Sequence, residues 1–311
     1  MTTAMSPTAP SSNPGKAATL RRALLSGRTM YFMEAHDGLS ALIAQRSGFR
    51  ALWASGLAIS TAIGLRDASE ICASEMLKVV ERMAEVTTVP ILVDVDAGYG
   101  NFNNLRLIAR RLATYGVAGI CVEDKLHPKL NSYCEGAHNL AEIEEFCGRL
   151  RAVRDDQGPD GVVIVARTET LIAGRPMDEA LERAKAYSEA GADAILIHSK
   201  RQDAEEVIEF AARWRGELPL LAVPTTYYRT SAKVLQQAGV AGIIWANHSI
   251  RSAMRAMQQT CAEIKANDSI EPVETKVAAM SEIFELLRYS DLERDERNYL
   301  PGAIRAQLEA E

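Results

Sequence analysis

The sequence predicts a (β/α)8 barrel, in which eight parallel strands close into a ring and helices surround them. Eight short apolar runs recur along the chain without polar alternation, as is typical of parallel strands covered on both faces. Helical patterns with apolar residues at every third and fourth position separate these runs. The alternation spans about 250 residues and no glycine-rich phosphate loop follows the first run, so a closed barrel is favoured over an open doubly wound sheet.

The expected strands are short and rich in Val, Ile and Leu. In chain order they are residues 30–35, 51–56, 89–98, 118–124, 161–169, 192–199, 218–224 and 241–248. The helices between them include residues 69–86, 103–115, 140–155 and 177–190. At several junctions a Gly ends the helix and a small residue opens the next strand, as in "YGVAG" and "AGADA". The same joint therefore recurs along the chain.

The two ends of the chain differ from this repeating part. Residues 1–19 are rich in Pro, Ser, Thr and Ala and contain no apolar segment, which predicts a disordered tail rather than a signal peptide. Residues 20–266 form the expected barrel domain, and residues 267–311 form a C-terminal helical extension. The helical patterns at 249–267 and 273–289 exceed what eight strands require, so the surplus helix needs another surface for its apolar face, such as a partner subunit.

The composition limits the classes of partner. Against 41 Asp and Glu stand 35 Lys and Arg, a net charge of -6, and no basic run stands out, which argues against nucleic acid as a partner. No run approaches the roughly 20 apolar residues that cross a bilayer, so we expect no membrane partner. The five Cys residues include no CxxC pair, which is typical of reduced thiols in a cytoplasmic protein and argues against a structural zinc site.

Polar side chains close nearly every apolar run. In a barrel the active site lies where the strands end, so these side chains are expected at one mouth. In chain order they are Glu34, His36, Ser55, Gly56, Asp94, Asp96, Glu123, Arg167, His198, Thr225, Asn247 and His248.

Three of these residues are carboxylates expected close together. Asp94 and Asp96 are two apart on a predicted strand and would share a face, and Glu123 ends the next strand. Such crowding is tolerable when protons or a cation neutralise it, and oxygen ligands without His or Cys favour Mg²⁺ or Mn²⁺. The alternative is a set of solvated loop acids, but Asp94 lies inside an apolar run, where an unpaired charge is costly.

The remaining candidates fit an anionic ligand. Arg167 is a permanently charged fork suited to a carboxylate or a phosphoryl group, or alternatively forms a salt bridge in the barrel core. His198 could donate to an anion or satisfy a neighbour. Residues 54–56 could present backbone amides to an anion, or form a plain tight turn. The long polar loop after Glu123 is of the kind that is either disordered or functional.

Several blocks in order closely resemble the phosphoenolpyruvate mutases, within the isocitrate lyase and phosphoenolpyruvate mutase superfamily. They include "MEAHDGLSALIAQRSGF", "LWASGLAIS", "DVDAGYGNFNN", "GICVEDKLHPKLNS", "VARTETLIAG", "GADAILIHSK" and "IIWANH", and the likeness spans roughly residues 20–300. The resemblance implies a barrel with a helix exchanged between subunits of a dimer or tetramer. It also implies a Mg²⁺-dependent rearrangement of phosphoenolpyruvate to phosphonopyruvate, whose product feeds phosphonate biosynthesis.

The resemblance also assigns roles to particular residues. The metal cluster falls on Asp94, with Asp67, Asp96 and Glu123 completing it directly or through water. Substrate-binding positions match Trp53, Ser55, Gly56, Leu57 and Ser132. The groups expected to act in catalysis are Asp67, Lys129, Asn131, Arg167 and His198. Residues 124–140, the lid loop, are expected to close over the phosphoryl group, with Pro128 and Gly136 shaping or hinging them.

The lid loop also separates the alternatives. The mutase loop is closer to "EDKLFPKTNS", so His127 and Leu130 depart from it without removing a proposed ligand. Phosphonopyruvate hydrolase resembles "FPKDTS", with Thr where this chain has Asn131, and we interpret the Asn amide as helping to exclude water. Carbon-carbon lyases of the superfamily carry a "KKCGH"-like loop that is not matched here. A barrel that only binds a metabolite would need a degraded metal set.

Overall fold

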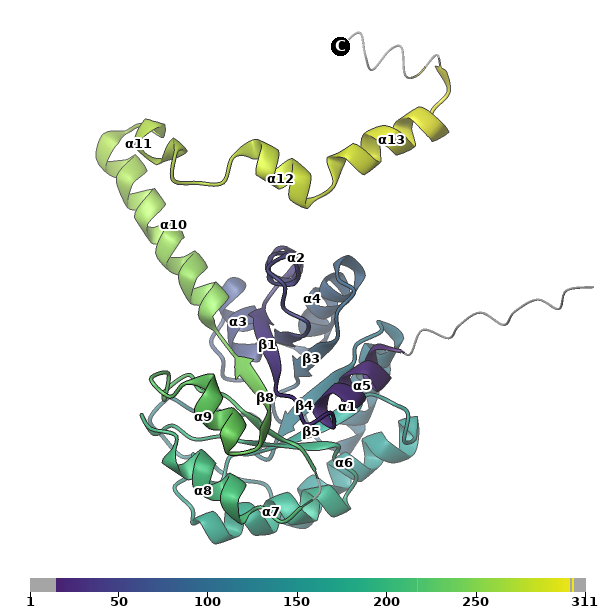
Figure 1. Cartoon of the computed structure of the whole chain (residues 1–311), viewed down its shortest axis with the longest axis vertical. Helices are drawn as coiled ribbons and strands as arrows, with labels where there is room; N and C mark the ends of the chain where they lie inside the picture. The colour runs from purple at the N-terminus through teal and green to yellow at the C-terminus, as the bar shows by residue number, and fades with distance from the viewer. Residues whose placement is uncertain (1–14, 217, 303, 305–311) are drawn as a thin grey trace, which may run out of the picture. The chain divides into compact units, whose positions relative to one another are not determined.

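The computed structural model describes residues 15–216, 218–302 and 304 and confirms the predicted barrel (Figure 1). Eight parallel strands close into a ring in sequential order, β1-β2-β3-β4-β5-β6-β7-β8, with β8 pairing back to β1. Their bounds are β1 Met30–Ala35, β2 Leu52–Ala54, β3 Ile91–Asp94, β4 Gly119–Glu123, β5 Val163–Thr168, β6 Ala194–Ile197, β7 Leu220–Ala222 and β8 Val240–Trp245. All eight predicted strands are present, most of them shorter than their apolar runs.

Helices lie outside the ring and cover it (Figure 1). Those of the barrel are α1 Lys16–Leu24, α2 Gly38–Arg46, α3 Gly56–Ala62, α4 Ala73–Val86, α5 Phe102–Thr114, α6 Ile143–Gln157, α7 Met177–Glu189, α8 Glu205–Arg213 and α9 Ala232–Gln237. After β8 follow α10 His248–Asn267, α11 Glu271–Glu274, α12 Met280–Leu286 and α13 Tyr289–Tyr299. The amphipathic stripes form the layer between helices and strands, with Val80 and Met83 of α4 and Leu105 and Leu112 of α5 fully buried.

A second apolar cluster fills the inside of the ring. It draws on alternate residues of the strands, because successive side chains of a strand point to opposite faces. Its members include Phe32, Leu92, Cys121, Val165 and Leu196, all with 0% exposure. The interior is therefore packed, and the inward-facing positions continue in steps of two towards the carboxyl ends of the strands.

Helix α1 packs into the same interior cluster. Leu20 and Leu24 are its buried residues, and Leu20 lies against Gly119, where an added Cβ would come within 3.1 Å of Leu20 Cδ2 and 2.9 Å of the Val163 carbonyl. Gly119 opens β4, so this contact is at the amino ends of the strands. The tail was predicted to cover residues 1–19. Residues 1–14 of it lie outside the described residues, whereas its last residues, from Lys16 onwards, form the start of α1. The helix packs through only two apolar residues four positions apart, and this pattern is too short to predict a helix next to a Pro- and Ser-rich segment.

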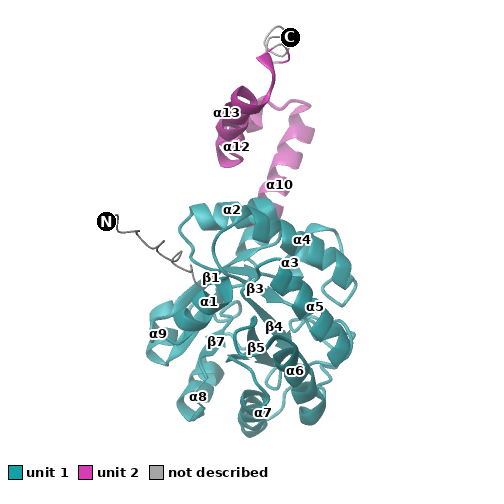
Figure 2. Ribbon diagram, turned by 90° about the vertical axis from the view of Figure 1, so that its right-hand side faces the viewer, with its two compact units in different colours: residues 1–251 teal, residues 252–311 magenta. Residues whose placement is uncertain are grey.

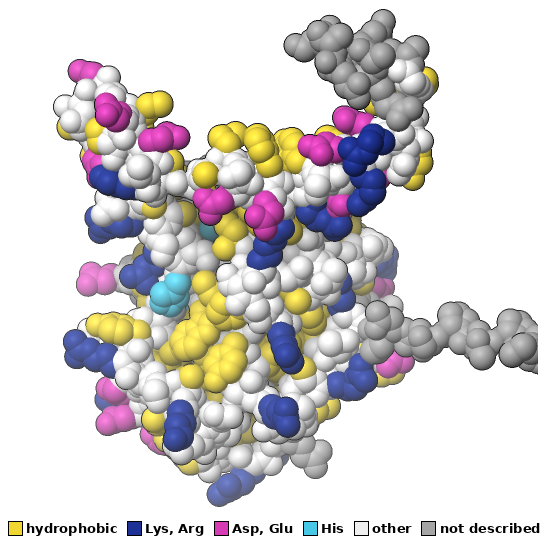
Figure 3. Space-filling view, turned by 45° about the horizontal axis from the view of Figure 1, so that its top comes forward, with side chains coloured by type: hydrophobic (Ala, Val, Ile, Leu, Met, Phe, Trp, Pro, Cys, Tyr) yellow, Lys and Arg dark blue, Asp and Glu magenta, His cyan; other side chains and the backbone are white. Residues whose placement is uncertain are grey.

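The chain divides into two compact units, residues 1–251 and 252–311 (Figure 2). The first unit ends within α10, earlier than the boundary at residue 266 expected from the sequence, because most residues of α10 beyond that point are exposed. In the second unit Val273 is the one buried residue among those described. Apolar side chains of its helices face solvent among charged ones (Figure 3), including Met257, Met280, Ile283, Phe284, Leu287 and Leu292. None of the described helices is both long and apolar enough to span a membrane.

Candidate active site

A small cavity of about 50 Å³ lies at the carboxyl ends of the strands. At roughly 10–15 Å³ each, it has room for a few water molecules. Its lining comprises Trp53, Ser55, Leu57, Asp67, Asp94, Lys129, Asn131, Ser132, Tyr133, Arg167, His198, Val223, Ala246 and Asn247. Most residues predicted for the site line this cavity. Gly56, Asp96 and Glu123 adjoin it, in contact with Asp94, Lys129 and Arg167 respectively.

Strand periodicity explains why these side chains converge. Asp94 lies two residues beyond inward-facing Leu92, and Glu123 lies two beyond Cys121. Arg167 and His198 stand in the same relation to the inward-facing residues of β5 and β6. Each polar residue therefore continues the interior series of its strand at the point where the apolar packing stops. Larger clefts, such as one of about 460 Å³ between the ends of α1 and α2, lie away from these groups.

The acid pair on β3 is assembled differently from the prediction. Asp94 ends the strand, but Asp96 lies in the following turn with a left-handed φ of 49°, so the expectation that both lie on one strand is wrong. The turn brings the Asp96 amide to 3.2 Å from Asp94 Oδ1, which accepts its hydrogen bond. Both carboxylates face Gly56, where an added Cβ would lie 3.0 Å from Asp96 Oδ1 and 3.4 Å from Asp94 Oδ2. A side chain at position 56 would displace them.

Burial makes these acids reluctant to ionise. Loss of solvent and the nearby charge of Asp96 raise the pKa of Asp94 to about 6. Burial likewise raises the pKa of Glu123 to about 7, although Lys125 and Arg167 oppose the shift. Glu123 Oε1 is buried and has no hydrogen-bond partner within the described residues. The carboxylates thus form a cluster of buried negative charge that nearby cations balance only in part.

Two residues of the lid loop reach into this cluster through Asp67. Lys129 forms an ion pair with Asp67, and its Nζ lies 3.0 Å from Asp96 Oδ1. Asn131 Nδ2 donates to the second Asp67 oxygen at 2.5 Å. Burial would raise the pKa of Asp67, but the Lys129 charge and these hydrogen bonds outweigh burial and lower it. Within the described ranges no three acidic, His or Cys side chains are arranged to hold a metal ion, and Lys129 lies between Asp67 and Asp96.

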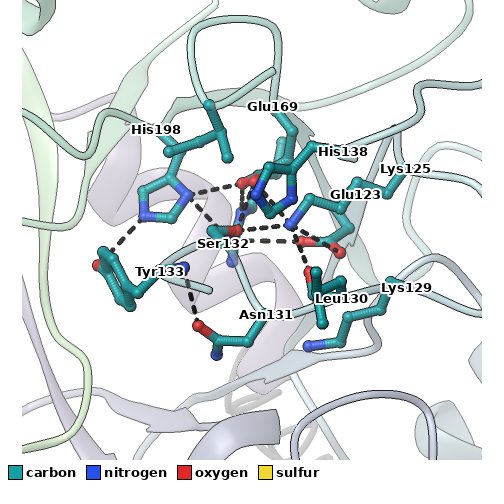
Figure 4. A network of polar contacts seen from close by, with 12 residues as sticks. Glu123, Lys125, Lys129, Leu130, Asn131, Ser132, Tyr133, His138, Glu169 and His198 are labelled. Atoms are coloured by element: carbon teal, nitrogen blue, oxygen red, sulfur yellow. Dashed lines mark hydrogen bonds and ion pairs between the residues drawn. The ribbon is translucent and has the colours of Figure 1, made fainter. Parts of the chain in front are cut away.

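Glu169, which the sequence analysis missed, joins the other side of the cavity (Figure 4). Its Oε1 accepts from Arg167 Nε at 2.5 Å and lies 2.6 Å from His198 Nδ1. Its Oε2 accepts from Ser132 at 2.5 Å and lies 3.0 Å from Lys125 Nζ, a second missed residue. Despite full burial, the Arg167 and His198 neighbours hold the pKa of Glu169 well below its usual range. Glu169 and Lys125 each lie two residues beyond a predicted inward-facing charge, so the strand period could have indicated them.

His198 is uncharged in this setting. Burial lowers its pKa to about 4, with the Arg167 charge adding to burial and Glu169 opposing it. His198 Nδ1 lies between Glu169 Oε1, at 2.6 Å, and Arg167 Nη2, at 2.9 Å. Nε2, on the other side of the ring, lies 3.3 Å from the Tyr133 hydroxyl of the lid loop. Arg167 is the cation that lines this half of the cavity, with Nη2 3.3 Å from Glu123 Oε2, and Lys125 lies behind it on Glu169.

Residues 54–56 form a helix start rather than a plain turn. Ser55 is the N-cap of α3, and its Oγ accepts from the Ala58 amide at 3.3 Å. The amides of Gly56 and Leu57 belong to the first turn, where backbone donors have no partner within the helix. Trp53, 2% exposed, forms the adjacent wall.

Other strand-end candidates lie outside the cavity lining. Asn247 lines it, whereas Glu34, His36, Thr225 and His248 do not. Glu34 instead accepts from the Ile250 amide at 3.0 Å and lies 2.6 Å from His36 Nδ1, which ties β1 to the start of α10.

Known proteins share both this sequence and this fold. The family model for phosphoenolpyruvate phosphomutase matches residues 20–265. The phosphoenolpyruvate phosphomutase of Streptomyces hygroscopicus is 48% identical, with 92% of this chain and 94% of that protein covered. A crystal structure of phosphoenolpyruvate phosphomutase from Streptomyces platensis subsp. rosaceus superimposes with a TM-score of 0.89 at 39% identity, covering 92% and 99% of the two chains. Phosphonopyruvate hydrolase in complex with oxalate and Mg²⁺ gives a TM-score of 0.86 at 35% identity, covering 92% and 100%. The chain belongs to the phosphoenolpyruvate phosphomutase family.

Proposed function

We propose that this protein is a phosphoenolpyruvate mutase, an isomerase that interconverts phosphoenolpyruvate and phosphonopyruvate and so supplies a carbon-phosphorus bond for phosphonate biosynthesis. The observation that carries the proposal is the contact of Asn131 and Lys129 with Asp67 across a cavity that also contains Arg167 and His198. These are a cationic fork, an amide donor and an ammonium around one small space, which suits a phosphoryl group. A relative named phosphoenolpyruvate phosphomutase is 48% identical to this chain.

The donor set fits a divalent cation. Asp94, Asp96 and Glu123, with Asp67, offer only hard oxygen ligands, and Glu123 Oε1 is buried without a hydrogen-bond partner among the described residues. We propose Mg²⁺, with Mn²⁺ as a substitute, held by Asp94 and by the other acids directly or through water. When bound, the ion supplies positive charge that stabilises the enolate of pyruvate.

The chain's own residues would position the substrate. The amides of Gly56 and Leu57 and the hydroxyl of Ser55 would orient the pyruvyl portion against Trp53, since the first turn of α3 has donors to offer. Arg167 would hold the phosphoryl group as a permanent charge, and neutral His198 would act by hydrogen bonding rather than by charge. Lys129, Asn131 and Ser132 would hold the phosphoryl group from the lid loop.

The reaction requires that water be kept out while the phosphoryl group moves. In the direction from phosphonopyruvate, the bond between phosphorus and C3 breaks and a bond between phosphorus and the enolate oxygen at C2 forms, with no proton or water consumed. Fixed donors of Arg167 and Lys129 stabilise the moving group, whose charge is spread over its oxygens. Lys129, Asn131, Ser132 and Tyr133 of the lid loop line the cavity and leave little room for a competing water.

A second copy of the chain is the proposed partner of the C-terminal helices, in a dimer or tetramer with exchanged helices. Exposed apolar residues on α10, α12 and α13, such as Met257, Ile283 and Leu292, need a surface to cover them. We also place the protein in the cytoplasm, which agrees with five cysteines that remain free thiols.

Phosphorus NMR of the protein incubated with phosphonopyruvate and Mg²⁺ tests the function. We expect the phosphonate signal to be replaced by that of phosphoenolpyruvate, without net phosphate release. Pyruvate with free phosphate as the main products would refute the mutase and favour the hydrolase. No conversion at all would leave two alternatives, a carbon-carbon lyase and a metabolite-binding barrel. Release of a keto acid from a branched malate or citrate would identify the lyase.

A further inference from the structure

Lys125 is a buried cation to which the proposed function gives no role. Its side chain is 2% exposed, although it lies at the start of the lid loop, whose polar sequence is typical of a solvent-exposed segment. An ammonium has three donors and no acceptor, and three oxygens lie within 3.0 Å of this one, with Glu123 Oε1 further away at 3.9 Å. Nζ donates to the Leu130 carbonyl at 2.9 Å and to Ser132 Oγ at 2.6 Å, and lies 3.0 Å from Glu169 Oε2. All its donor capacity is therefore used.

The three oxygens come from two different parts of the barrel mouth. Leu130 and Ser132 lie in the middle of the lid loop, whereas Glu169 immediately follows β5. Lys125 itself lies at the fixed base of the loop, where it bridges to Leu140 and where the Leu126 amide donates to the Asn139 carbonyl at 2.9 Å. The Lys125 side chain thus connects the base of the loop to the middle of the loop and to the end of β5.

The residues that Lys125 holds are the two neighbours of Asn131. Figure 4 shows Ser132 among the charged groups of Lys125 and Glu169, while the Asn131 side chain lies outside that group. With both flanking residues tied down, the Asn131 amide is directed to Asp67. If the loop moved away, the Lys125 ammonium would lose both of its hydrogen bonds to the loop and keep only its ion pairs with Glu169 and Glu123, which is costly for a buried charge.

We propose that Lys125, held by Glu169, is a positioning residue that keeps the lid loop closed during phosphoryl transfer and thereby determines how often water captures the phosphoryl group. This inference rests on the proposed mutase function. Capture by water breaks the bond between phosphorus and C3, forms a bond between phosphorus and the water oxygen, and leaves C3 to take up a proton. The products are then pyruvate and phosphate instead of phosphoenolpyruvate.

The test compares Lys125→Met, which keeps the length of the side chain without its charge, with Glu169→Gln and with the control Lys16→Met. Lys16 also donates to a backbone carbonyl, that of Thr87 at 2.9 Å, but outside the cavity lining. Phosphorus NMR with phosphonopyruvate and Mg²⁺ measures the ratio of phosphate to phosphoenolpyruvate formed. We expect this ratio to rise roughly tenfold in Lys125→Met and in Glu169→Gln, the scale of one charge-assisted hydrogen bond, and to stay unchanged in Lys16→Met.

Chymotrypsin cleavage of the lid loop gives a second readout that does not depend on the reaction. Tyr133 and Leu126 are exposed and offer cleavage sites. Cleavage there should be faster by roughly tenfold in Lys125→Met, because the loop opens more often. A thermal melt shows whether Lys125→Met folds. If it does not fold, the test rests on Glu169→Gln, which preserves the shape of the side chain.

The outcomes separate the two proposals. Folded variants with the unchanged product ratio and unchanged loop cleavage would overturn the role of Lys125 even if the unaltered protein is a mutase. An unaltered protein that releases only phosphate would refute the mutase function and with it the product-ratio claim. Faster loop cleavage with an unchanged product ratio would overturn the proposed control of water capture.

Discussion

The two ends of the same eight strands are equally buried but chemically opposite. At the amino ends, Leu20 of α1 joins Leu92 and Val163 in an apolar cluster with 0% exposure. At the carboxyl ends, Asp94 and Glu123 are 8% and 2% exposed and have ionisable side chains. Apolar burial contributes to the free energy of folding, whereas burial of unneutralised acids subtracts from it. One barrel therefore separates the residues that stabilise it from those that we propose to act in catalysis.

The largest effect is expected at the carboxyl ends. Asp94→Asn removes the central proposed metal ligand and should lower mutase turnover by about a thousandfold, the scale of losing a central electrostatic group. The free energy of unfolding without metal should not fall, because a buried negative charge is removed. Phosphorus NMR rates and urea unfolding measure the two quantities. Full activity in this variant would remove the metal hypothesis.

The opposite outcome is expected at the amino ends. Leu20→Ala opens space in the interior cluster and should reduce the free energy of unfolding by about 2–5 kcal/mol. Turnover per folded molecule should stay unchanged, since Leu20 lies outside the lining of the cavity. Urea unfolding and active-site-normalised rates test this. Loss of turnover without loss of stability would contradict the separation of the two ends.

The lid loop is expected to give an intermediate effect. Asn131→Ala removes the amide that donates to Asp67 and should lower mutase turnover about ten- to a hundredfold, as expected for a lost hydrogen bond to a charged group. Metal affinity, measured by calorimetry, should stay nearly intact. Glu135→Ala is the matched control, because Glu135 is exposed in the same loop and does not line the cavity. Equal turnover in the two variants would refute the role of Asn131.

The smallest effect concerns pH and lies at the end of β1. Burial disfavours the charged form of His36, but the hydrogen bond and charge of Glu34 and the charge of Asp37 outweigh burial and raise the pKa of His36 above 6.5. The folded state therefore binds this proton more tightly, and the stabilisation is complete below pH 6.5 and lost as pH rises through the raised pKa. Between pH about 6 and about 9, Tm should fall less in His36→Gln than in the unaltered protein. Equal falls would contradict the pairing with Glu34.

The sequence predicts the barrel well because its signals are local and repeated. Each strand is a short apolar run, and the inward-facing period of two carries through to Asp94, Glu123 and Arg167. Those side chains could therefore be expected at the mouth before any contact was known. Helix α1 was not predicted because it depends on tertiary packing of Leu20 and Leu24 rather than on a long amphipathic pattern.

The rest of the site depends on contacts that sequence spacing does not contain. Asp67 lies in a turn that is far along the chain from any strand end, so only the family resemblance indicated it as a site residue, and its ion pair with Lys129 was not predicted. Asp96 reaches the cluster through a left-handed turn, not through strand alternation. The strand period points to Lys125 and Glu169, but their burial depends on the contacts that join Glu169, after β5, to Lys125 and Ser132 of the lid loop, and these contacts do not show in the sequence.

The cavity of about 50 Å³ has a kinetic consequence. A phosphorylated three-carbon acid is larger than the few water molecules that fit there, so we expect the loop segment with Lys129, Asn131, Ser132 and Tyr133 to move before a substrate enters and again before a product departs. Each catalytic cycle then contains two passages of the loop, and solvent viscosity acts on both. If the chemical step is faster than these passages, the maximum rate of such an enzyme equals the frequency with which the loop opens.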